Sequence, residues 1–130
     1  MAAVDFGAWA APNLEIKLGD RTYEVRPPSV EDAKLILALA VRGEVKLGMV
    51  KAKVPTEVEA LIKTIPKDAH PALGDAFERM RRDGHPAATI DRVAYYAIFF
   101  WARGKAYADS LAAILWTPRA TEAADASPKG

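Results

Sequence analysis

The sequence contains no cysteine, which excludes a disulfide framework and any metal site built from thiolates. Its two histidines, His70 and His85, each precede a proline in a predicted loop, and no HExxH or similar spacing accompanies them. A zinc site needs three or four suitably spaced ligands. We therefore expect no metal ion, and we interpret both histidines as ordinary surface residues.

Long apolar runs are also missing. The most apolar stretch is the ten residues between Arg92 and Arg103, whereas a membrane-spanning helix needs about 18 or more apolar residues. The first residues, "MAAVDFGAWAAP", lack a basic region and carry Asp5 early, so they do not resemble a signal peptide. We expect no membrane segment, and the absence of cysteine fits a reducing cytoplasm.

The chain has almost no net charge, because 18 basic residues face 17 acidic ones. This balance does not indicate a polyanionic partner. The segment "ERMRRDG" gathers three arginines, but Glu78, Asp83 and Asp91 dilute their field. We expect no nucleic acid partner, although a small DNA-binding or regulatory module on the helices at 73–103 stays open as the alternative function.

Motifs for catalysis are absent as well. Ser29 is a helix cap, Ser127 lies in the polar tail, and Ser110 lacks a GxSxG context. No glycine-rich phosphate loop occurs. We expect a protein that is not an enzyme and that binds no cofactor. An enzyme subunit whose site needs a partner chain is a third hypothesis without a supporting cluster of residues.

A β-hairpin over residues 14–25 is the clearest local signal. In "LEIKLGDRTYEV", apolar and polar residues alternate on both sides of Gly19-Asp20, which can form a two-residue turn. That turn pairs Leu14 with Val25 and Ile16 with Tyr23, so all four side chains share one apolar face. A lone hairpin is marginal in water, so this face must pack against the rest of the domain.

Helical patterns follow the hairpin. We expect a mostly α domain (α+β), a compact bundle of four to five helices, over residues 13–116. Gly43 is interpreted as the stop of the first helix, and the connection 44–54 is ambiguous. Residues 1–12 are expected to form a flexible arm and residues 117–130 a disordered tail. The helices are expected at about 30–42, 56–65, 72–83, 86–103 and 105–116.

The stretch "AYYAIFFWARG", Ala94–Gly104, is apolar on all sides of a helix. Such a helix is usually buried on all sides, so we expect the central helix of the bundle. Aromatic residues of this kind are also enriched in protein interfaces. Both interpretations can hold together, with some rings directed inward and others at a rim.

Three segments together resemble the tail assembly chaperones of long-tailed bacteriophages, especially those of actinobacteria, which are analogous to the lambda-like frameshifted chaperones. "LEIKLGDRTYEVRPPSVEDAKLI" is similar to the opening hairpin, PxPS motif and first helix of that family. "LGDAFERMRRDGHP" is similar to its LGxxxxxMxxDGxP segment. "AIFFWARGKAYADSLA" is similar to its ALxWWxxGxxxA ending, with "FFW" where a tryptophan pair is more usual. The resemblance covers about residues 14–115.

The resemblance implies a non-catalytic chaperone that binds the long helical tape measure protein and promotes tail-tube assembly. Such proteins act in the host cytoplasm and are not expected in the mature virion. Contacts with the tail tube protein and self-association are further partners that stay open. The resemblance also implies a programmed −1 ribosomal frameshift, and codons for Ser127, Pro128 and Lys129 can form a slippery sequence.

We expect the partner-binding surface to include four aromatic residues near the end of the chain. Covering exposed apolar helix faces of a client requires an apolar surface on the chaperone. The candidates are Tyr95, Phe99, Trp101 and Tyr107.

Overall fold

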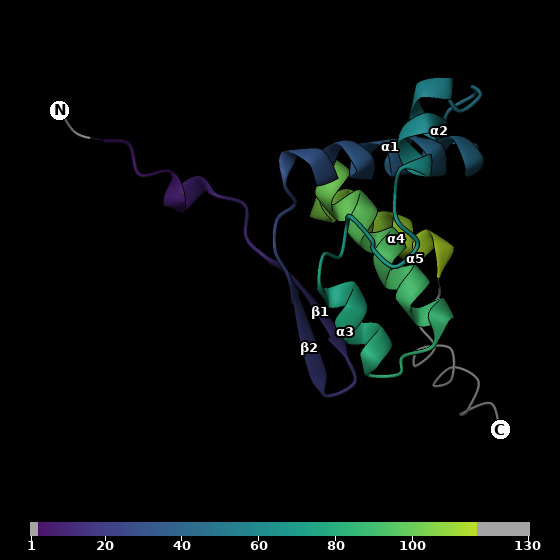
Figure 1. Ribbon diagram of the computed structural model, residues 1–130. Coiled ribbons are helices and arrows are strands. Elements are labelled where there is room, and N and C mark those ends of the chain that lie inside the picture. Colours follow the sequence, from purple (N-terminus) through teal and green to yellow (C-terminus); the bar gives the residue numbers. More distant parts are fainter. Residues whose placement is uncertain (1–2, 117–130) are drawn as a thin grey trace.

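The computed structural model describes residues 3–116 of the 130-residue chain. It confirms the expected class, because one antiparallel hairpin precedes five α-helices in this part of the chain (Figure 1). The predicted disordered tail lies outside the described residues. The elements are β1 (Leu14–Leu18), β2 (Arg21–Val25), α1 (Val30–Lys46), α2 (Thr56–Lys63), α3 (Ala76–Arg82), α4 (Ala87–Arg103) and α5 (Lys105–Leu115).

The hairpin has the predicted register, with Leu14 opposite Val25, Ile16 opposite Tyr23 and Leu18 opposite Arg21. Gly19 has a φ of 67° in the turn, a conformation that glycine adopts without steric cost. The apolar face is covered as expected, because Leu14, Tyr23 and Val25 are all buried. The shared face therefore anchors the hairpin to the helices.

Residues 3–12 lie apart from the body of the molecule, as Figure 1 shows for the purple end of the ribbon. The arm contains a short 3-10 helix, η1 (Phe6–Trp9). The Asp5 carboxylate caps it by accepting a hydrogen bond from the Gly7 amide at 2.9 Å. The arm predicted for residues 1–12 thus has local structure of its own.

The predicted end of the first helix at Gly43 is wrong. α1 continues through Gly43 to Lys46, and its backbone turns at Gly48, which has a φ of 80°. The Gly48 amide donates to the Val45 carbonyl and the Met49 amide to the Glu44 carbonyl, each at 3.0 Å. These two bonds form a Schellman motif. Gly43 has another role, since it lies where α1 approaches Tyr95 and Phe99 closely.

The other helices begin or end a few residues from the predicted bounds. α2 is two residues shorter at its end than the predicted 56–65. α3 begins at Ala76 rather than at 72, because tight turns come first: Leu73 and Gly74 both donate to the His70 carbonyl, at 3.1 and 3.0 Å. α4 and α5 differ from the predicted 86–103 and 105–116 by one residue each.

α4 is the central helix of the bundle. It packs against α1, α3 and α5, and Figure 1 shows it crossing below α1 in the middle of the molecule. Its buried residues lie on two sides of the helix, with Phe99 roughly opposite the other four. They are Ile90, Ala94, Ala97, Ile98 and Phe99.

Candidate partner-binding site

A buried carboxylate joins α1 to the end of α4 and the start of α5. Glu44 is only 7% exposed. Arg103 donates to it through Nε and Nη2, each at 2.9 Å, and the Tyr107 hydroxyl donates at 2.7 Å. The Arg103 hydrogen bonds, which outweigh the opposing effect of burial, lower the pKa of Glu44. The carboxylate is therefore held ionised by three hydrogen bonds from two residues.

The same network orients the ring of Tyr107. Burial, followed by the hydrogen bond to Glu44, raises the pKa of Tyr107 to about 12, so its hydroxyl remains a donor at neutral pH. The Tyr107 oxygen also lies 3.8 Å from Sδ of Met49. This arrangement places the connection after α1 beside the first turns of α5.

An apolar hollow of about 300 Å³ opens between these two segments. We call it the α5 hollow. Met49 is 50% exposed and Ile114 is 79% exposed, so its rim offers large apolar side chains to solvent. Leu47 and Val50 extend the exposed apolar surface along the chain. The lining residues are Met49, Ala106, Tyr107, Ser110, Leu111 and Ile114.

The four predicted binding residues have different environments. Tyr107 lines the α5 hollow. Phe99 is 1% exposed and its ring stacks on that of Tyr107 at 5.8 Å, so it cannot touch a partner while the domain is folded. Phe99 contributes by supporting the ring of Tyr107 from inside the core.

Tyr95 and Trp101 are half-buried and lie outside the α5 hollow. Tyr95 contacts the edge of Phe99 at 5.2 Å between ring centroids. Trp101 donates from Nε1 to the Ala72 carbonyl at 3.0 Å, which ties α4 to the turns before α3. The structure thus brings Tyr95, Phe99 and Tyr107 into one aromatic row and places Trp101 elsewhere.

Sequence reasoning missed the contribution of residues 47–50. The connection 44–54 was ambiguous because Gly48 and lysines interrupt it, yet Leu47, Met49 and Val50 are the apolar signal it contains. On α5, Tyr107, Leu111 and Ile114 stand at the i, i+4, i+7 spacing of one helix face. The predicted frameshift residues, Ser127, Pro128 and Lys129, lie outside the described residues.

Both histidines differ from the surface residues we expected. His70 is half-buried, and its Nδ1 accepts a hydrogen bond from the Ala72 amide at 3.1 Å. Burial lowers the pKa of His70 to about 4. His85 lies 2.9 Å from the Tyr23 hydroxyl, which also donates to Asp83. Each histidine therefore has a structural partner that the sequence did not reveal.

Neither histidine belongs to a metal site in the part of the chain that the structure describes. Within residues 3–116, no group of three or more His, Cys, Asp or Glu side chains is placed to hold a metal ion. In the same range, no helix has both the length and the apolar character of a membrane span.

Comparison with family models assigns the chain to one family. The chain belongs to the family described as "Domain of unknown function (DUF7426)", whose model matches residues 4–129. The match covers the hairpin, all five helices and the α5 hollow. Searches of curated proteins and of solved structures return no match.

Proposed function

We propose that this chain is a non-catalytic tail assembly chaperone of a long-tailed bacteriophage. In this proposal it binds the tape measure protein in the host cytoplasm, promotes assembly of the tail tube and is absent from the mature virion. The three sequence segments that resemble such chaperones support it. The α5 hollow is the observation that carries it, because exposed large apolar side chains gathered around a hollow are typical of a protein-binding site.

The proposed mechanism is coverage of apolar helix faces. An amphipathic helix of the client lays its apolar stripe into the α5 hollow, with Tyr107 and Leu111 at the floor and Ile114 at the rim. The Glu44 network holds the floor rigid, which lowers the ordering cost of binding. Binding only the unassembled client then stabilises its soluble form by mass action.

Three lysines close to Met49 in the sequence indicate the polar character of the client helix. Lys46, Lys51 and Lys53 lie within four residues of Met49 and are exposed. Among residues 3–116, none of these three lysines forms an ion pair. A client helix whose polar flank carries Asp and Glu is therefore favoured over a basic one.

Co-expression with the candidate client tests the proposal. The client is the product of the very long reading frame expected downstream of this gene, and the full chain should recover it as a soluble complex. Ile114→Asp should weaken binding by about 10-fold to 100-fold, the loss typical of an interface hot spot. Val30→Asp is the matched control, because Val30 is 75% exposed and does not line the hollow.

Two results would contradict the proposal. A client that is equally soluble without the chain would remove the chaperone role. Equal binding by the Ile114→Asp and Val30→Asp variants would exclude the α5 hollow as the contact surface. Salt-dependent binding of duplex DNA by the wild-type chain would instead favour the DNA-binding alternative.

A further inference from the structure

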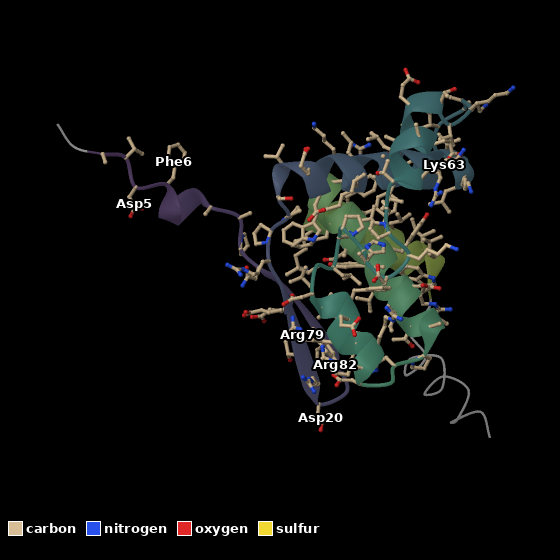
Figure 2. The ribbon with its side chains drawn as sticks, viewed as in Figure 1. Asp5, Phe6, Asp20, Lys63, Arg79 and Arg82 are labelled. Atoms are coloured by element: carbon tan, nitrogen blue, oxygen red, sulfur yellow. The ribbon has the colours of Figure 1, made fainter. Side chains whose placement is uncertain are left out.

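The two edges of the hairpin have different surroundings. α3 packs against β2, and Arg79 of α3 donates from Nη2 to the Glu24 carbonyl at 3.0 Å; Figure 2 shows Arg79 beside the hairpin. The edge of β2 is therefore covered. The outer edge of β1 pairs with no strand, because within residues 3–116 its only strand partner is β2. An uncovered edge strand is a template for pairing with another chain.

The register shows which backbone groups this edge offers. In a hairpin with a two-residue turn, Leu18 and Arg21 exchange hydrogen bonds, and bonded pairs then alternate along the ladder. Leu14 and Ile16 thus direct their backbone groups toward β2. Glu15 and Lys17 direct their N–H and C=O groups outward, where an incoming strand can reach them.

A groove of about 510 Å³ follows the open edge. One wall is the chain from Pro12 to Lys17, and the other is formed by Tyr96, Phe100 and Lys105. Ile16 and Leu18 are only half-buried on the apolar face of the hairpin. An added strand would therefore find backbone partners at the edge and an apolar surface beneath its inward side chains.

We propose that a second copy of this chain fills the groove, with its β1 paired antiparallel to β1 across a two-fold axis at Ile16. In this register Glu15 lies opposite Lys17 of the second copy, and Lys17 lies opposite its Glu15. Both are outward-directed positions, so four backbone hydrogen bonds form. The result is a four-stranded sheet in which Ile16 faces Ile16 as a pair without hydrogen bonds.

The charge pattern of β1 favours a second copy of the chain as the occupant of the groove. Glu15 and Lys17 are exposed and stand symmetrically about Ile16, so the strand is complementary to itself. Centring the axis on Glu15 or Lys17 instead places like charges opposite each other, which is unfavourable. This inference concerns β1 alone and does not depend on the α5 hollow.

Charge reversal tests the pairing by analytical ultracentrifugation over a wide range of protein concentration. The wild-type chain should dimerise. E15K and K17E should each weaken the dimer by about tenfold or more, because two opposite-charge pairs become like-charge pairs. The double variant E15K/K17E should dimerise again, and a mixture of the two single variants should form a heterodimer. E57K is the control for net charge, since Glu57 is exposed on α2.

A cysteine cross-link tests the register. The chain has no cysteine of its own, so I16C adds a single thiol to each copy. Opposite residues of a pair without hydrogen bonds have Cα atoms about 4.5 Å apart, which is within disulfide range. Oxidation at low concentration should therefore yield a linked dimer for I16C. T22C, on β2 and exposed, should remain largely monomeric.

Three results would overturn the inference. A wild-type chain that is monomeric at every concentration removes the dimer. A dimer that E15K and K17E leave unchanged removes the proposed register. A dimer that survives both charge reversals but disappears when residues 1–12 are deleted makes the N-terminal arm the occupant of the groove.

Discussion

Replacing Gly43 by alanine sets helix propensity against packing at the contact between α1 and α4. Alanine in a helix interior is favoured over glycine by about 1 kcal/mol, so propensity alone predicts a more stable protein. The structure predicts the reverse. A Cβ atom at position 43 would lie 3.0 Å from Oη of Tyr95 and 3.1 Å from Cζ of Phe99, which is closer than ordinary van der Waals contact.

The Phe99 ring has little freedom to withdraw. It is 1% exposed, stacks on Tyr107 at 5.8 Å and meets the edge of Tyr95 at 5.2 Å. Adding a methyl group to a packed core costs about 1–3 kcal/mol. Subtracting the propensity gain leaves a net loss of about 1 kcal/mol, or a decrease of ~4 °C in Tm for a domain of this size.

Urea unfolding followed by circular dichroism, at one protein concentration, measures this loss. Tyr95→Phe removes the oxygen nearest to the new methyl group, so the Gly43→Ala change should cost about 0.5 kcal/mol less in that background. If Gly43→Ala raises the free energy of unfolding, the close approach of α1 and α4 does not limit the helix, and the reasoning is refuted.

Three further substitutions test contacts around the core. Glu44→Gln should lower the free energy of unfolding by about 2 kcal/mol at neutral pH, because the charge-assisted bonds from Arg103 are weakened. The pKa of Glu44 is lowered in the fold, so wild-type stability should fall as the pH drops from the ordinary glutamate range through the folded pKa; the glutamine variant should lack that part of the loss in pH-dependent urea titrations. His70→Asn keeps an acceptor for the Ala72 amide but does not titrate. Since the folded pKa of His70 is about 4, its contribution is present above pH 6.5 and is lost as the pH falls toward 4; the same titrations should show a shallower decline for this variant, and an unchanged slope would contradict the burial of the neutral ring. Trp101→Phe should cost about 1 kcal/mol in thermal unfolding through loss of the bond to the Ala72 carbonyl, and unaltered stability would show that this bond has no net effect.

Local physics allowed some of these features to be predicted from sequence. The register of the hairpin follows from the two-residue turn at Gly19 and from the period of its apolar residues, since a shift by one residue would turn the whole apolar face to solvent. The central position of α4 was likewise predictable, because Ala94–Gly104 has no polar face to direct toward water.

The candidate site was predicted only in part, because surface exposure depends on neighbours that are distant in sequence. The aromatic pattern named Tyr107 and Phe99 together and could not separate them, although Tyr107 lines the α5 hollow and the core encloses Phe99. Met49 lies in the hollow because the chain turns at Gly48. The sequence analysis placed that turn at Gly43 instead.

Gly43 and Gly48 show which features the sequence determines and which depend on the tertiary structure. The sequence by itself determined that the first helix must end near a glycine after residue 42, and that a hairpin with one apolar face precedes it. Only the tertiary structure decided which glycine ends the helix. Gly43 is needed for the close approach of Tyr95 and Phe99, whereas Gly48 supplies the positive φ that closes α1 and turns Met49 toward α5. Both roles require glycine, and they differ in whether the missing Cβ relieves a contact between helices or a strain within the backbone.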